Sequence, residues 1–349
     1  MAQGVKVAVV GCGAVAEHRH LPALAQGKDC QIAVLVDCNR TRAEQLAAQY
    51  SVPTVLTEYR DLRDLDIDIA IVALPNYLHA PVSIELLSAG IDILVEKPMA
   101  LSVAECDRML QAAQDGGAVL AVALPRRFLY ANRFAKWAID SGLLGRLISV
   151  DMQDGVVFQW PLASDFFFCK DKAGGGVFID NGSHAVSHLL WWLGKVRSFA
   201  YYDDSCGGVE AECKLSLEFR SGAVASVELS RLRNLRNTTI VRGERGELEV
   251  GLWTNSVSLR LADSDIVIHG QGALGDRPVV SEQTQIDLVA AEHEDFLTAI
   301  KTGRQPVGSG AEAKGAIALI EACYKTRRPL VHPWEDTVCE PTRVLAYGA

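Results

Sequence analysis

Short apolar runs alternate with amphipathic stretches over the first third of the chain. Five runs are rich in β-branched residues and apolar on both faces, at 5–10, 32–36, 69–74, 91–95 and 118–122. Runs of this kind are typical of strands buried on both sides of a parallel sheet. The stretches between them, such as 41–49 and 80–88, have helical spacing. The alternation predicts a doubly wound α/β domain over residues 1–123.

The pattern changes after Pro125. Helical spacing returns at 132–141 and 177–193, and strict apolar–polar alternation follows at 211–219 and 223–229. Ser221 and Gly222 separate these two segments, which predicts a hairpin within an antiparallel sheet that has one buried face. Two further helices are expected at 290–302 and 311–324, and the last twenty-odd residues look irregular.

Composition excludes several classes of protein. Of the 349 residues, 49% are hydrophobic and 22% are charged, which is close to the average of globular proteins and argues against long disorder. The formal net charge of -9 argues against a general nucleic-acid binder, because such a protein needs basic surface to displace counterions from phosphates.

Cysteine usage and hydropathy suggest the compartment. The nine cysteines are an odd number with no CxxC pair and no zinc-like spacing. We expect them to be reduced, as in the cytoplasm. No apolar run approaches the roughly 20 residues of a membrane helix, and the chain starts with no long apolar signal core. We therefore expect a cytoplasmic protein without a membrane partner.

A glycine-rich turn follows the first predicted strand. Gly11, Gly13, Ala14 and Val15 lie within a G-x-G-x-x-A pattern that opens a helix. The first glycine permits a tight turn and the second lets the backbone approach a pyrophosphate, which then faces the helix N–H groups. The pattern alone is weak, but its position between strand and helix predicts a dinucleotide site.

The choice between the two nicotinamide dinucleotides depends on the end of the second strand. Asp37 stands about 20 residues past the glycine loop, where a carboxylate accepts both ribose hydroxyls and repels a 2′-phosphate. Arg40 and Arg42 follow it, and a guanidinium there can bind a 2′-phosphate instead. The sequence favours NAD as the cofactor and leaves NADP open.

Further motifs give the chain a family resemblance. Leu94-Val95-Glu96-Lys97-Pro98 ends the fourth strand, and Leu74-Pro75-Asn76-Tyr77-Leu78-His79 ends the third. The stretch from Gly174-Gly175-Gly176 to Asp180-Asn181-Gly182-Ser183-His184 opens the helix at 177–193. Together with the glycine loop, these motifs resemble the glucose–fructose oxidoreductase, inositol dehydrogenase and MocA family over nearly the whole chain.

The resemblance implies an architecture and a cofactor site. It implies a Rossmann domain followed by an α/β domain, here 124–349, whose largely antiparallel open sheet serves oligomer contacts. A homodimer or homotetramer is therefore expected. It implies NAD or NADP as cofactor, sugar-like alcohols as substrates, and Pro75, Asn76, His79, Glu96 and Lys97 at the cofactor.

The same resemblance suggests the reacting groups. Oxidation of a secondary alcohol requires loss of the hydroxyl proton while hydride moves to the nicotinamide. The Lys97 ammonium can hydrogen-bond the reacting oxygen and stabilise alkoxide charge. By resemblance, His184 is the expected general acid/base and Asp180 is expected to orient it or to bind a neighbouring hydroxyl.

Asp180, His184 and His188 are spaced by four on one helix and so share a face. Many relatives carry an aspartate where His188 stands, which puts any role of that carboxylate in doubt here. The three side chains also resemble a metal-ligand set. Ligands on consecutive turns of one helix rarely converge on one ion, so we expect no metal.

Substrate contacts are the least constrained expectation. Trp160 and the run Phe166-Phe167-Phe168 lie before the glycine triplet and can pack on a sugar ring or simply anchor their loop. Arg127 is a further candidate for substrate binding. Two other functions stay open: a non-catalytic dinucleotide- or sugar-binding regulator, and a glycosidase that uses NAD for transient oxidation.

Overall fold

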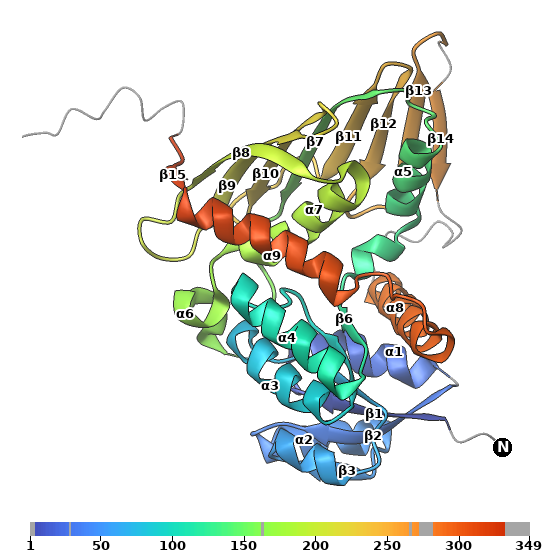
Figure 1. Cartoon of the computed structure of the whole chain (residues 1–349), viewed down its shortest axis with the longest axis vertical. Helices are drawn as coiled ribbons and strands as arrows, with labels where there is room; N and C mark the ends of the chain where they lie inside the picture. Colours follow the sequence, from blue (N-terminus) through green and yellow to red (C-terminus); the bar gives the residue numbers. More distant parts are fainter. Residues whose placement is uncertain (1–3, 28, 162–163, 265–266, 272–281, 332–349) are drawn as a thin grey trace, which may run out of the picture.

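Two sheets organise the chain in the computed structural model, which describes residues 4–27, 29–161, 164–264, 267–271 and 282–331 (Figure 1). A six-stranded sheet occupies one end of the molecule and a nine-stranded sheet the other. Helices lie between them and around the smaller sheet. The expected α/β fold class is confirmed. The expected irregular C-terminal tail lies mostly outside the described residues.

The smaller sheet is parallel throughout, with strand order β3-β2-β1-β4-β5-β6. Its strands are β1 (Val5–Val10), β2 (Cys30–Val36), β3 (Thr54–Leu56), β4 (Ile69–Val72), β5 (Asp92–Val95) and β6 (Leu120–Val122). Five of them match the five apolar runs. The order reverses between β1 and β4, and ligands of such sheets bind at that switch point.

Helices cover both faces of this sheet, as the two-sided burial of its strands requires. They are α1 (Leu21–Gln26), α2 (Arg40–Tyr50), α3 (Asn76–Ser88) and α4 (Val103–Gly116). Short 3-10 turns, η2 (Tyr59–Asp64) and η3 (Pro125–Phe128), follow β3 and β6. The helix after the glycine loop begins with a π-helical turn, η1 (Ala16–His20), and such turns occur often at functional sites.

The larger sheet is mixed and mostly antiparallel, in the order β14-β13-β12-β11-β7-β10-β9-β8-β15. Its strands are β7 (Leu147–Gly155), β8 (Val196–Asp203), β9 (Glu212–Phe219), β10 (Val224–Ser230), β11 (Thr238–Gly243), β12 (Gly246–Gly251), β13 (Ser256–Leu261), β14 (Val267–Gln271) and β15 (Arg328–Pro329). The hairpin expected at Ser221-Gly222 joins β9 to β10, which confirms that prediction.

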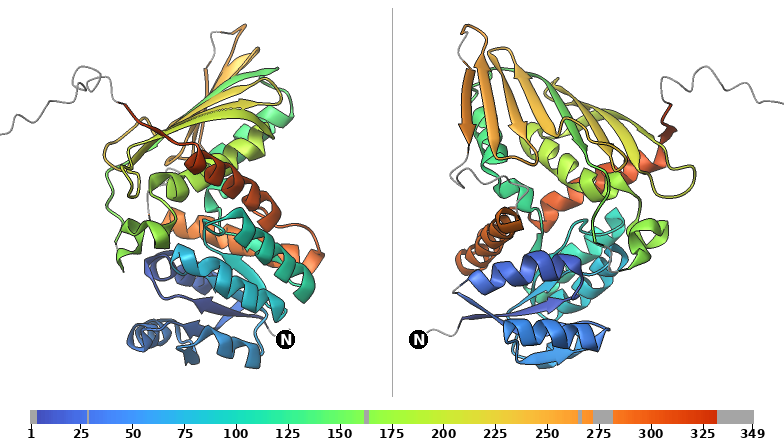
Figure 2. Two further views of the ribbon diagram at one scale, coloured as in Figure 1. Left: turned by 60° about the vertical axis from the view of Figure 1, so that its left-hand side comes forward. Right: turned by 180° about the vertical axis from the view of Figure 1, so that it is seen from behind.

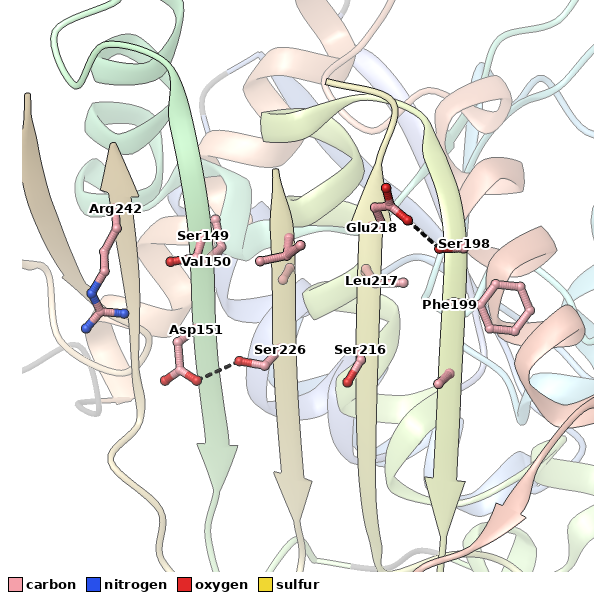
Figure 3. Close-up of a pocket in the computed structure, with 13 residues that line it drawn as sticks. Ser149, Val150, Asp151, Ser198, Phe199, Ser216, Leu217, Glu218, Ser226 and Arg242 are labelled. Carbon is pink, nitrogen blue, oxygen red and sulfur yellow. Dashed lines mark hydrogen bonds between the residues drawn. The ribbon is translucent and has the colours of Figure 1, made fainter. Parts of the chain in front are cut away.

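One face of the larger sheet is covered by α5 (Tyr130–Asp140), α7 (Val177–Leu193) and α9 (Gly310–Lys325), as Figure 2 shows. Leu215 and Val227 are buried in the core beneath these helices. The opposite face is open and carries a shallow hollow lined by small polar side chains, among them Ser149, Ser216 and Ser226 (Figure 3). This is the one-sided burial that the alternating pattern predicts.

The chain returns to the smaller sheet near its end. Phe296 of α8 (Glu282–Thr302) packs into the core around β1, and Ile317 of α9 packs into the core around β4 and β5. The C-terminal part of the chain therefore completes the cores of the N-terminal sheet. None of the helices in the described ranges is long and apolar enough to cross a membrane.

Candidate active site

The glycine loop lies between β1 and the helix that starts the cofactor site. Gly11 has a φ of +100°, and a Cβ there would lie 2.3 Å from the Ala73 carbonyl oxygen, so only glycine fits. A Cβ at Gly13 would meet nothing within 4 Å. Open space at this backbone and a helix N-terminus beside it fit a bound pyrophosphate. Ala14 and Val15 form the first residues of that helix.

Asp37 lies beside this loop at the end of β2. Its Oδ2 accepts a hydrogen bond from the Cys12 N–H at 2.7 Å, and its Oδ1 accepts one from the Asn39 N–H at 2.8 Å. Arg42 donates to the Cys12 carbonyl at 2.5 Å and to Glu17 at 2.6 Å. Asp37 and Arg42 thus both form hydrogen bonds with the backbone of the glycine loop.

Arg40, the other arginine near Asp37, is exposed and pairs with Glu44 at 2.8 Å on its own helix. Both candidate cations for a 2′-phosphate therefore already have carboxylate partners. The Asp37 carboxylate stands at the end of β2 beside the glycine loop, an arrangement that favours ribose hydroxyls over a 2′-phosphate.

The ends of β4 and β5 meet at one edge of the sheet. His79, which is 1% exposed, places Nδ1 at 2.7 Å from the Pro98 carbonyl oxygen and Nε2 at 2.8 Å from that of Leu74. It therefore ties the Pro75 loop to the cis Lys97–Pro98 peptide. Asn76 is also buried and donates to the Ala173 carbonyl oxygen at 2.8 Å. Both side chains thus tie the segment after β4 to backbone carbonyl oxygens of neighbouring segments.

Glu96 contacts His20, which in turn contacts a second histidine, His293. The Nε2 of His20 lies 3.0 Å from Glu96, and the Nδ1 of His20 lies 3.0 Å from the Nε2 of His293 on α8. An ionised Glu96 accepts a hydrogen bond from the Nε2–H of His20, so Nδ1 of His20 accepts one from His293. Burial would raise the pKa of Glu96, but the interactions with His20, Lys97 and His79 together outweigh burial and lower that pKa.

The start of α7 is fixed by a buried carboxylate. Oε1 of Glu210 accepts hydrogen bonds from the N–H groups of Gly176 at 2.8 Å and Phe178 at 2.9 Å, and from the Tyr324 hydroxyl at 2.7 Å. A Cβ at Gly176 would lie 1.8 Å from the Glu210 carbonyl oxygen. The glycine triplet thus permits the close approach that sets the position of α7.

The first turn of α7 brings Asp180 to Lys97, from which it is 83 positions distant in the sequence. Oδ1 of Asp180 pairs with the Lys97 ammonium, and its Oδ2 accepts from Arg231 at 2.5 Å. Burial would raise the pKa of Asp180, but these two cations outweigh it and lower the pKa to about 2. Each carboxylate oxygen of Asp180 thus contacts one cation, and an orienting role of Asp180 toward His184 stays a prediction.

His184 lies one turn further along α7 and is buried. Its pKa lies well below the usual value because burial disfavours the imidazolium, and the cations of Arg126 and Lys97 add to this. Nδ1 of His184 is buried without a hydrogen-bond partner in the described part of the chain. The ring is therefore a neutral imidazole at neutral pH, and a neutral imidazole can accept a proton.

His188 lies one turn beyond His184 on α7 and is buried. Its Nδ1 lies 2.7 Å from the His184 carbonyl oxygen, and its ring packs beside Trp191 and Trp192. Burial, with Arg127 next, lowers its pKa to about 3. In the residues that the structure describes, no cluster of His, Cys, Asp or Glu can hold a metal ion.

The two arginines after β6 differ in surroundings. Arg126 pairs with Asp154 at 2.7 Å, and its guanidinium lies 4.4 Å from the Trp253 ring centroid. Arg127 is 4% exposed, pairs with Glu312 and donates to the Ser187 hydroxyl at 2.8 Å. Arg127 is thus engaged through both terminal nitrogens, whereas its buried Nε has no hydrogen-bond partner among the described residues. The charges of both arginines lower the pKa of His184, and Arg126 has the larger effect.

An aromatic cluster borders Arg231. Phe158 packs near Phe167 and Phe168, with ring centroids 6.1 and 5.9 Å away. Phe168 is 58% exposed. Trp160 is half-buried and lies 5.9 Å from the Arg19 guanidinium, near the helix that follows the glycine loop.

Four functional or supporting residues escaped the sequence interpretation: Arg231, Glu210, Asp154 and His293. Each acts through a contact made far along the chain, and none lies in a spacing that a local pattern reveals. Glu210 and Arg231 flank the β9–β10 hairpin. For Glu210 and Arg231, the signal in the sequence was a polar residue beside the end of a predicted strand.

Residues 5–124 match a family model described as an oxidoreductase family with an NAD-binding Rossmann fold, and residues 132–249 match the GFO/IDH/MocA C-terminal domain. A D-xylose 1-dehydrogenase (NADP(+)) 2 of Haloferax volcanii is 27% identical over 91% of this chain and 96% of that protein.

Solved structures share the fold. The aldose-aldose oxidoreductase of Caulobacter crescentus, complexed with glycerol, superimposes with a TM-score of 0.81 at 24% identity over 93% of this chain and 97% of that one. Levoglucosan dehydrogenase in complex with NADH and levoglucosan has a TM-score of 0.83 at 22% identity, over 93% and 97% of the two chains.

Proposed function

Because the chain belongs to the Gfo/Idh/MocA family of oxidoreductases, we propose that it transfers a hydride between a nicotinamide dinucleotide and a secondary alcohol of a sugar, sugar derivative or cyclitol. The observation that carries this proposal is the meeting of Lys97 with Asp180 at the carboxyl edge of the smaller sheet, one helical turn from His184. Names of relatives such as D-xylose 1-dehydrogenase support the substrate class.

The dinucleotide supplies the hydride acceptor or donor when it is bound. The chain's own groups handle the oxygen and the proton. Lys97 donates a hydrogen bond to the reacting oxygen and stabilises its negative charge as the carbon is oxidised. His184, a neutral imidazole, takes the hydroxyl proton, and in the reverse direction it returns one. Asp180 orients the ammonium of Lys97 by holding it in an ion pair.

We further propose NAD as the preferred cofactor. The Asp37 carboxylate favours ribose hydroxyls over a 2′-phosphate, and both nearby arginines are engaged by Glu44 and Glu17. The cofactor lies on Gly11, Gly13, Ala14 and Val15, with Pro75 and Asn76 beside the nicotinamide half. Residues 1–123 form the cofactor domain of this proposal and 124–349 the substrate domain.

Substrate contacts of the proposal lie on the second domain. Trp160 and the Phe158 cluster provide apolar surface for the C–H faces of a sugar ring. Arg126 replaces Arg127 as the arginine nearest the substrate, because Arg127 is buried against Glu312 and Ser187. The cysteines of the described residues are free, which supports a cytoplasmic location.

We also propose that the protein is a homo-oligomer that pairs through the open face of the larger sheet. The face is shallow, and small side chains such as Ser149, Ser216 and Ser226 line its hollow (Figure 3). Phe199, Asp151, Glu218 and Arg242 also line the hollow, and two such sheet faces can pack against each other.

The test has two steps. Calorimetry with NAD and with NADP measures the dissociation constants, and we expect NAD to bind about tenfold or more tightly than NADP, a difference of about 1.4 kcal/mol. A panel of sugars, sugar acids and cyclitols is then screened for formation of reduced nicotinamide. Binding of neither dinucleotide below millimolar concentration, or dinucleotide binding with no turnover across the panel, contradicts the proposal.

A further inference from the structure

Arg231 touches the reaction centre and no sequence motif marks it. It follows the last residue of β10, and its guanidinium donates to Oδ2 of Asp180 at 2.5 Å while Lys97 pairs with Oδ1 of the same carboxylate. One carboxylate therefore carries two cations. Because both cations contact one carboxylate, they lie within a few ångströms of each other.

The surroundings hold Arg231 in this position. Its backbone N–H donates to the Ala211 carbonyl oxygen at 2.9 Å, and its own carbonyl accepts from the Phe158 N–H at 2.8 Å. The guanidinium lies over the Phe158 ring at 5.0 Å from the centroid and 6.0 Å from that of Phe167. Arg231 is only 9% exposed. A buried, stacked guanidinium has little freedom to leave its partner.

The charge count has a consequence for Lys97. An isolated Lys97–Asp180 pair would be neutral, and its field at a nearby oxygen would be small. With Arg231 on the other oxygen, the three groups carry one net positive charge, which offsets the charge of the neighbouring Glu96 carboxylate. Charge of that sign beside the reacting oxygen favours an alkoxide, and it is worth most in a site shielded from water.

We propose that Arg231 is a positioning residue of the reaction centre, which holds one oxygen of Asp180 and offsets the negative charge of Asp180 at Lys97. The role of Arg231 in the reaction rests on the proposed function. The electrostatic link between Arg231 and Lys97 is nevertheless measurable without substrate or cofactor, so its failure is distinct from failure of the proposed function.

The test is competitive acetylation of the full-length protein with acetic anhydride, which reacts with neutral amines only. Peptide mass spectrometry measures the acetylation rate of Lys97 over a series of pH values. The reference is the acetylation rate of Lys301, whose side chain is 52% exposed. In Arg231→Gln the ammonium loses a neighbouring like charge and gains the whole carboxylate. Both effects make it hold its proton more firmly.

We expect the relative labelling rate of Lys97 at pH 8 to fall by roughly threefold or more in Arg231→Gln, and to stay within about twofold of the native rate in Arg231→Lys, which keeps the charge. Arg233→Gln is the matched control, because Arg233 lies two positions on and pairs with Glu212 and Glu228 away from Lys97. If circular dichroism shows that Arg231→Gln is unfolded, Arg231→Met is used in its place, because the methionine keeps an apolar stem against Phe158. A rate for Lys97 that is unchanged or faster without the Arg231 charge overturns the proposal.

Discussion

Ion pairs and neutral histidines at single positions set the chemistry of this molecule. Asp180 is kept ionised by two cations, whereas His184 and His188 are kept neutral by burial and by neighbouring arginines. The environment thus lowers the pKa of all three groups on this helix, which separates a charged Asp180 from two neutral histidines. That separation is what a site needs if one group is to hold charge and another to accept a proton.

The buried histidines predict a loss of stability in mild acid. The folded-state pKa of His188, about 3, lies below its ordinary value of 6.5, and those of His184 and His293 are lowered as well. Below pH 6.5 the unfolded chain takes up protons that the folded chain refuses, so stability falls as the pH falls. For His188 the loss continues until the pH reaches about 3.

The measurement is urea unfolding at pH 7 and pH 5. For His188→Leu we expect the drop in unfolding free energy between these pH values to be smaller than in the native protein by roughly 2 kcal/mol. His269→Gln, at an exposed position on β14, serves as the control and keeps the native drop. An equal drop in all three proteins would show that His188 is not held neutral.

At the scale of elements, local patterns predicted most of the fold. The β-branched runs at 5–10 and 91–95 and the helix at 177–193 appear within a residue or so of the expected bounds. β3 was missed because its three half-buried residues carry no alternation. The packing of α8 against the first sheet was missed because Phe296 meets that core only through the tertiary fold.

The candidate site, like the fold, was predicted where local motifs mark its residues. Lys97 and Asp180 stand in recognisable motifs, and they do meet. Arg231 follows a strand in Ser230-Arg231-Leu232, where nothing local separates it from a solvated arginine. Arg127 was expected at the substrate, yet Glu312 and Ser187 from distant helices take up its donors. Such partners depend on tertiary contacts that a single sequence does not encode locally.

Helix α7 depends on the carboxylate of Glu210 for its position. In Glu210→Ala the N–H groups of Gly176 and Phe178 lose their acceptor, as does the Tyr324 hydroxyl. We expect a loss of unfolding free energy on the order of 2 kcal/mol. Because α7 carries Asp180 and His184, turnover falls as well.

Chemical denaturation measures the loss of unfolding free energy in Glu210→Ala. Two further variants are compared with it. Tyr324→Phe removes one donor of the three, so its cost is smaller. Glu210→Gln keeps an acceptor oxygen and is expected to lie between the native protein and Glu210→Ala. Native stability in Glu210→Ala would mean that α7 is positioned by its core packing alone.

At the scale of the whole molecule, the chain places its two sheets so that groups from both reach one centre. Lys97 comes from the carboxyl edge of the smaller sheet, Asp180 from a helix that covers the larger sheet, and Arg231 from the end of a strand in that sheet. The open face of the larger sheet lies on the side away from α5, α7 and α9 (Figures 1 and 2). Assembly through that face would leave the centre accessible.

Light scattering tests the proposed assembly. Ser216 lies in the hollow of the open face, so a bulky side chain in Ser216→Trp would hold two sheets apart. We expect the mass in solution to fall toward that of one chain, 37.8 kDa. Gln114→Trp, which adds the same bulk at an exposed position on α4, keeps the native mass. An unchanged oligomer in Ser216→Trp would exclude this face as the contact.

The central claim is that Lys97 acts on the reacting oxygen at the nicotinamide end of a cofactor held elsewhere. The most direct measurement pairs calorimetry of NAD with single-turnover formation of reduced nicotinamide in Lys97→Ala, using whichever alcohol the screen identifies. We predict NAD affinity within about threefold of the native value and a rate lower by about 10²–10⁴. Equal loss of affinity and rate, or a rate near that of the native protein, would contradict the account.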